Sequence, residues 1–218
     1  MVKQSKVLKI EEPRIHMDLP EGQLPEHLQD EDSFDFNEVI DQSFEAQEAH
    51  KLRFDQMVFT RVSFEHVNFR HIELTDVVFD RCNLSNVDFS DAIMHRVEIN
   101  QSKLTGANFS GATLRHVKVE GCIANYGTFG FSNLKQVAFI DTSMLQSDIN
   151  ESTLTHVRFT NCQIDGMNFA ETSLNGIDLT SCTFDGLVVS LDCLRGLTVT
   201  EGQAIGLSKL LGLNVLGN

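Results

Sequence analysis

Several residue types and patterns are scarce in this chain of 218 residues, and each absence narrows its class. It has no tryptophan and one tyrosine, and its three prolines all precede residue 26. The residues after Met1 lead into no long apolar run, so the sequence predicts neither a signal peptide nor a membrane span. A cytoplasmic location is therefore expected.

Motifs that carry catalysis or metal binding are also missing. No Ser-His-Asp constellation stands out, and Gly106 to Gly111 lack the Lys-Ser/Thr of a phosphate-binding loop. Four of the five cysteines are separated by multiples of 20 residues, which matches no zinc motif: Cys82, Cys122, Cys162 and Cys182. We predict that they fill one buried column, and that the chain has no enzymatic activity, cofactor or metal.

What the chain does have is an unbroken five-residue period. From Phe54 to Val199, each fifth residue is a large apolar side chain or, once, alanine, over 30 of 30 positions. A second column lies two residues earlier, from Leu52 and Met57 onward. Residues two apart on an extended backbone point to one side, and the polar residues between the pairs favour turns. The sequence therefore predicts a solenoid.

Individual units resemble a known family. Cys82-Asn83-Leu84-Ser85-Asn86 and Ala107-Asn108-Phe109-Ser110-Gly111 look like pentapeptide repeats. This resemblance implies an all-β fold, a right-handed quadrilateral β-helix with four units per coil. We expect an acidic, partly ordered segment over residues 1–41, the repeat over 42–200, and a dimerisation segment over 201–218. The weakest points of the repeat are expected at Asp192, which is charged at an inward position, and at Ala124-Gly127.

Charge is unevenly placed when residues are assigned to four faces by their position in a 20-residue coil. The faces centred on the Phe54 and Phe59 columns carry 9 acids and 9 bases over residues 51–200. Those centred on the Phe64 and Phe69 columns carry 8 acids and 3 bases. Two interpretations are open: a solvated surface, or a stripe that docks a basic partner. The candidate stripe on the Phe69 face comprises Asp88, Asp91, Asp148, Glu151 and Glu171.

An apolar group occupies nominally outward positions in one part of the repeat, and it offers an alternative binding surface. It comprises Ile123, Tyr126, Phe131, Ile140 and Leu145. These side chains either pack on neighbouring corners or form a patch for a protein partner. On the second interpretation, the chain is a non-enzymatic interaction scaffold.

The five-residue period stops after Val199, where a helix is predicted. Thr200 and Gln203 have the spacing of a capping box, and Gly212 suits a helix C-terminus. A short apolar strand over residues 213–216 could follow. This apolar end either covers the solenoid core or joins a second copy. The candidate dimer contacts are Ala204, Leu207, Leu210, Leu211 and Val215.

The tail from Val199 to Leu213 and the stretch from Gly121 to Phe131 are similar to Qnr-type pentapeptide proteins of Gram-positive bacteria. This resemblance implies a homodimer that binds DNA gyrase or topoisomerase IV by imitating duplex DNA and lowers fluoroquinolone sensitivity, without binding nucleic acid or membrane itself. Gram-negative members carry loops that interrupt the repeat, whereas the register here is never broken.

Overall fold

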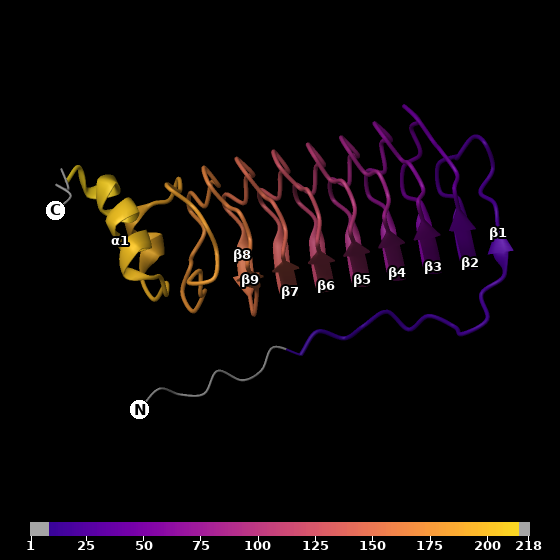
Figure 1. Cartoon of the computed structure of the whole chain (residues 1–218). Coiled ribbons are helices and arrows are strands. Elements are labelled where there is room, and N and C mark those ends of the chain that lie inside the picture. Colours follow the sequence, from indigo (N-terminus) through magenta and orange to yellow (C-terminus); the bar gives the residue numbers. More distant parts are fainter. Residues whose placement is uncertain (1–8, 214–218) are drawn as a thin grey trace.

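The computed structural model describes residues 9–213, which form a rod of stacked coils with a helix at one end (Figure 1). The strands and the helix are β1 (Glu21–Gly22), β2 (Ser33–Ile40), β3 (Arg53–Thr60), β4 (Glu73–Asp80), β5 (Ile93–Asn100), β6 (Thr113–Glu120), β7 (Asn133–Ile140), β8 (Thr153–Thr155), β9 (Arg158–Thr160) and α1 (Glu201–Ser208). Two 3₁₀ turns, Leu191–Leu194 and Lys209–Leu211, complete the regular structure of this part of the chain.

Successive coils are related by a shift of 20 residues. In β3 and β4, Phe54 pairs with Leu74 and Phe59 pairs with Phe79, in parallel. The other two sides of the coil are joined by single bridges, such as Ser63 with Asn83. Twenty residues are four five-residue units, so the predicted four-sided β-helix is confirmed.

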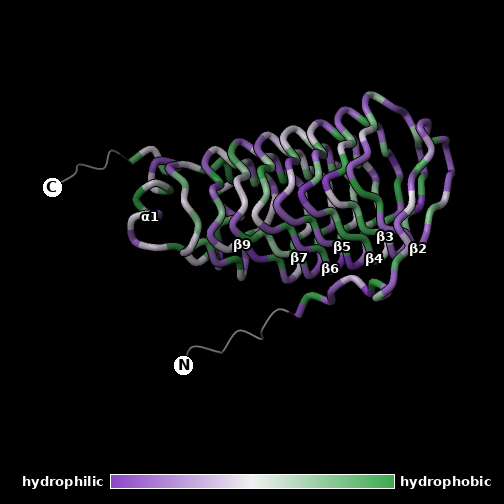
Figure 2. Tube along the Cα trace, turned by 45° about the vertical axis from the view of Figure 1, so that its right-hand side comes forward, coloured by the Kyte–Doolittle hydropathy of each residue, from purple (hydrophilic) through white to green (hydrophobic). Residues whose placement is uncertain are grey.

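The Phe54 column forms the core. It is buried at each position from Phe54 to Ile149, and Figure 2 shows hydrophobic and hydrophilic residues alternating along the coils. Aromatic rings stack from coil to coil, as in Phe109 and Phe129, whose ring centroids lie 4.8 Å apart. Near the C-terminal end the column is only half-buried, at Leu154, Phe184, Leu194 and Val199.

Corners recur every five residues because one residue in each unit adopts a left-handed backbone conformation. Gln56, Arg61 and His66 have φ of 52°, 55° and 58°. Glycine is favoured where a side chain would also collide: a Cβ at Gly106, with φ of 70°, would strike the Asn86 side chain of the preceding coil. The repeat therefore accounts for Gly106 and Gly111.

One of the two predicted weak points is confirmed and the other was wrong. A small apolar void of about 10 Å³ lies beside Ala124, between Phe109 and Phe129, where the core thins. Asp192, by contrast, does not point inward. The 3₁₀ turn Leu191–Leu194 holds it on the surface, which avoids the cost of burying a charge.

The β-helix begins earlier than predicted. β2 pairs with β3 from Ser33 onward, with Phe34 opposite Phe54 and Val39 opposite Phe59. The first coil therefore starts before residue 42, because Phe34 and Val39 continue the apolar columns by one more coil. In the described residues, no helix is long and apolar enough to cross a membrane, and no cluster of His, Cys, Asp or Glu side chains suits a metal ion.

Candidate interaction surfaces

The acidic residues of the predicted stripe lie in two neighbouring columns of the Phe69 face. Asp88 and Asp148 belong to the column of single bridges, and both carboxylates are used locally. Asp88 Oδ1 accepts the Ser90 amide at 2.9 Å, and Asp148 Oδ1 accepts the Asn150 amide at 2.8 Å. Each also accepts a side-chain amide hydrogen bond from the asparagine one coil on. These two carboxylates are therefore fixed in direction.

Asp91, Glu151 and Glu171 occupy the adjacent corner column, with φ of 57°, 49° and 55°. Asp91 forms an ion pair with Arg70 at 3.2 Å, and a second contact with His71 at 3.8 Å. The Ser190 hydroxyl donates to Glu171 at 2.8 Å. Asp91 is thus largely neutralised by its neighbours.

Gly111 and Phe131 separate these acids into two groups along the rod. Phe131 lies in the same corner column and is 62% exposed, so an aromatic ring interrupts the charge. Among residues 9–213, no ion pair involves the members of the second group, Asp148, Glu151 and Glu171. We call this second group the acidic cluster. It carries the uncompensated negative charge of the Phe69 face.

The apolar residues predicted to be outward are only partly brought together. Ile123 and Tyr126 are 47% and 59% exposed on the Phe64 face. Leu145 is half-buried below them, and its carbonyl accepts the Tyr126 amide at 2.9 Å. Ile140 is half-buried at the end of β7, and Phe131 lies on a different corner. The shared patch therefore consists of Ile123, Tyr126 and Leu145.

The C-terminal helix begins as predicted and covers the end of the core. Thr200 and Gln203 form the capping box, and Gly212 ends the following turn with φ of 69°. The Gln203 amide also donates to the Leu179 and Cys182 carbonyls at 2.9 and 2.8 Å, which fastens α1 to the last coils. Leu207 packs against the core from above.

The candidate dimer contacts divide accordingly. Leu207 is partly buried within its own chain, whereas Ala204, Leu210 and Leu211 are exposed. Further exposed apolar side chains lie beside them at Ile205 and Leu213. Val215, like most of the expected strand over 213–216, lies outside the described residues. The end of the rod therefore presents an apolar surface even after Leu207 has covered the core.

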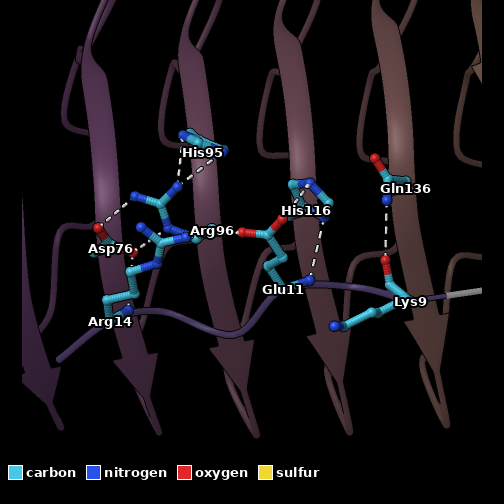
Figure 3. A network of polar contacts seen from close by, with 8 residues as sticks. All are labelled: Lys9, Glu11, Arg14, Asp76, His95, Arg96, His116 and Gln136. Atoms are coloured by element: carbon cyan, nitrogen blue, oxygen red, sulfur yellow. Dashed lines mark hydrogen bonds and ion pairs between the residues drawn. The ribbon is translucent and has the colours of Figure 1, made fainter.

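The N-terminal segment forms a surface that the sequence did not predict. Residues 9–20, which we call the strap, run along the sheet side of the rod from β7 back to β2 (Figure 1). Gln136 donates to the Lys9 carbonyl at 3.0 Å, and the Glu11 amide donates to His116 Nδ1 at 3.2 Å. The Arg14 amide donates to Asp76 Oδ1 at 2.9 Å (Figure 3).

The strap covers a column of polar side chains at the corner between the Phe54 and Phe59 faces. Asp76, Arg96 and His116 are 4%, 9% and 4% exposed. Arg96 donates to both carboxylate oxygens of Asp76 and also contacts His95. Burial opposes ionisation, but hydrogen bonds from Arg96 and the Arg14 amide lower the pKa of Asp76. Asp76 and Arg96 therefore form a buried ion pair.

Asp76 was expected to be an exposed acid whose charge could be reversed at little cost, and that expectation was wrong. The five-residue register correctly places it at an outward corner, but the strap covers this corner from a distance of 62 residues. The only available signal was the run of side chains at that corner position, Asp76, Arg96, His116 and Gln136, whose opposite charges follow one another at intervals of 20.

The strap should detach more readily as pH falls. Burial lowers the pKa of His116; Glu11 raises it, while Arg115, Arg96 and Lys135 lower it further. Docking thus favours neutral His116, so the stabilisation is present above its undocked pKa of about 6.5 and is lost below it. Between about pH 8 and about pH 5.5, we expect amide hydrogen exchange of residues 9–16, corrected for its intrinsic pH dependence, to accelerate several-fold.

His116→Gln supplies the control. Gln136 occupies the same corner one coil on with φ of 56°, so glutamine fits this backbone, and its amide oxygen can accept from Glu11. The variant should reduce the pH dependence to whatever His95 contributes, because burial also lowers the pKa of that imidazole. Equal pH dependence in both proteins would contradict the role of His116.

Comparison with known proteins places this repeat. A family model described as a pentapeptide repeat region matches residues 52–129 and 132–205. The chain belongs to the pentapeptide repeat family. A comparison with curated proteins finds no match.

Solved pentapeptide repeat structures are similar in fold. HetL, involved in heterocyst differentiation regulation in the cyanobacterium Nostoc sp. strain PCC 7120, is 15% identical with a TM-score of 0.54, over 79% of this chain and 84% of HetL. Full-length QnrB1, a plasmid-mediated fluoroquinolone resistance protein, is 14% identical with a TM-score of 0.41, over 81% of this chain and 100% of QnrB1. HetL therefore supports the fold alone, and the QnrB1 overlay is too loose to support an argument.

Proposed function

We propose that this protein is a non-catalytic, DNA-mimicking rod that binds DNA gyrase or topoisomerase IV and protects the enzyme from fluoroquinolones or modulates its activity. The observation that carries the proposal is the one-sided charge of a rigid rod, with 8 acids against 3 bases on two adjacent faces. The acidic cluster places Asp148, Glu151 and Glu171 on neighbouring coils of that side. The similarity of the C-terminal tail to Qnr-type proteins supports the same partner.

Charge density restricts the kind of mimicry. A duplex carries a charge every ~1.7 Å, so DNA as long as the repeat, ~36 Å, would hold roughly 21 charges. Residues 51–200 have 17 acids and 12 bases, a difference of −5. The rod therefore imitates the shape of DNA and a local stripe of charge, with the acidic cluster as its strongest part.

Charge reversal tests the proposal. Asp148→Lys with Glu151→Lys should weaken gyrase binding about tenfold, which corresponds to about 1.4 kcal/mol. Added salt should also weaken the wild-type complex, because exposed charges are screened within ~8–10 Å. Affinity is measured by surface plasmon resonance with immobilised gyrase at several salt concentrations.

Asp141→Lys with Asp178→Lys is the matched control. Both aspartates are exposed on the Phe59 face, and the Asp178 carboxylate accepts the Thr180 amide just as Asp148 accepts the Asn150 amide. The control changes net charge by the same amount. If both double variants lose the same affinity, general acidity, and not the acidic cluster, drives the association.

The patch formed by Ile123, Tyr126 and Leu145 favours a second candidate function, that of a scaffold for another protein. Ile123 and Tyr126 expose about half of their side chains, which is unusual for adjacent apolar residues on a repeat surface. On this alternative, Ile123→Ser with Tyr126→Ser abolishes partner binding, while the acidic-cluster variant retains it. Retained gyrase binding by the Ile123 and Tyr126 variant, with its loss in the acidic-cluster variant, would exclude it.

A further inference from the structure

The polar column beneath the strap has the construction of a binding site. We call its members, Asp76, Arg96, His116 and Gln136, the corner track. All four have left-handed backbones, with φ from 54° to 56°, so each presents its side chain at the same corner of successive coils. Arg96 holds both carboxylate oxygens of Asp76 and thereby fixes the direction of that acceptor.

The corner track recognises the strap mainly through its backbone. It binds the Lys9 carbonyl, the Glu11 amide and the Arg14 amide, and one side chain, Glu11, adds a carboxylate 3.7 Å from His116 Nε2. Backbone contacts depend little on sequence, so another extended segment can make them. Figure 3 shows these contacts following one another along the strands.

The spacing of the contacts fits an extended peptide that runs along the rod axis. Coils are ~4.8 Å apart, so the two coils from His116 to Asp76 span about 9.6 Å. Three extended residues, from Glu11 to Arg14, span about 10 Å. Pro13 keeps φ near −65° and biases Glu12 towards extended conformations, which maintains this match.

The strap can leave without opening the solenoid. It precedes β1, and none of its residues belongs to a strand of the sheet. Residues 11, 13 and 15 are half-buried and alternate with exposed residues 12, 14 and 16, so no strap side chain enters the core. Departure would leave His116 Nδ1 and the Gln136 amide without these partners, while Asp76 keeps Arg96.

We propose that the corner track is a binding site for an extended segment of a partner protein, which places a carboxylate side chain over His116 and a backbone amide three residues later on Asp76. In the free protein, the strap fills this site as a tethered competitor. A short tether gives an effective concentration in the millimolar range, so a partner segment binds well only when the strap is loosened. The site lies away from the acidic cluster and is independent of gyrase binding.

A loosened full-length variant tests the proposal. Glu11→Ala with Arg14→Pro removes the carboxylate and the amide donor and keeps the strap extended. The probe is a fluorescein-labelled synthetic peptide with the sequence of residues 7–18, measured by fluorescence anisotropy. The loosened variant should bind it at least tenfold more tightly than the wild-type protein does. A thermal melt checks that the solenoid of the variant is intact.

Two controls make the result decisive. A peptide carrying the same alanine and proline changes should not bind the loosened variant. Adding His116→Ala to that variant should reduce binding of the original peptide at least tenfold. Equal peptide binding by the wild-type and loosened proteins, or binding that does not depend on His116, would overturn the proposal.

Discussion

Asp76→Ala should lower the free energy of unfolding by about 3 kcal/mol, because it leaves the Arg96 guanidinium buried without its counter-ion. The Asp76 and Arg96 side chains are 6% and 10% exposed, and the strap lies above them. The loss is measured by chemical denaturation. Arg14 also loses the acceptor for its amide, so hydrogen exchange in the strap should accelerate as well.

Asp41→Ala is the matched control for this prediction. Asp41 and Asp76 both have φ of 55°, and each binds Nε and Nη2 of an arginine 20 residues later. The difference is exposure, because the side chains of Asp41 and Arg61 are 63% and 48% exposed. Backbone strain from alanine should be equal at the two corners. A loss at Asp41 as large as that at Asp76 would show that burial under the strap contributes nothing.

Leu210→Asp with Leu211→Asp should convert the proposed homodimer into monomers. Burying one leucine stabilises an interface by about 2 kcal/mol, so the loss of both corresponds to roughly a thousandfold weaker association. These residues replace Leu207 as the test positions, because Leu207 packs on its own solenoid and its substitution would also uncover the core. Mass is measured by light scattering after size-exclusion chromatography.

Ile123→Asp with Tyr126→Asp removes two exposed apolar side chains at a distance from the helix and should leave the dimer unchanged. This comparison separates a specific contact from a general effect of added charge. A double variant at Leu210 and Leu211 that remains dimeric would place the interface elsewhere.

The solenoid was predictable because its information is local. Each five-residue unit specifies its own inward pair and its own corner, and 30 consistent units leave little freedom in the register. The capping box of Thr200 and Gln203 was predictable for the same reason, since it involves residues three apart. The void at Ala124 followed from one small side chain in a column of large ones.

The strap could not be predicted in this way. Glu11 and His116 are 105 residues apart, and residues 9–20 carry no periodicity that would indicate their partner. An outward position in the register therefore does not ensure exposure, as Asp76 and His116 demonstrate. Charge counting also found the acidic faces but not the interruption by Phe131, because column totals ignore the order of residues along the rod.

DNA supercoiling by purified gyrase in the presence of ciprofloxacin, with increasing amounts of the wild-type protein, tests the proposed function most directly. The account predicts that the wild-type protein changes supercoiling or restores it against the drug, and that the acidic-cluster variant Asp148→Lys with Glu151→Lys does so about tenfold less effectively. Supercoiling that is unaffected by the wild-type protein, with and without the drug, would contradict the account.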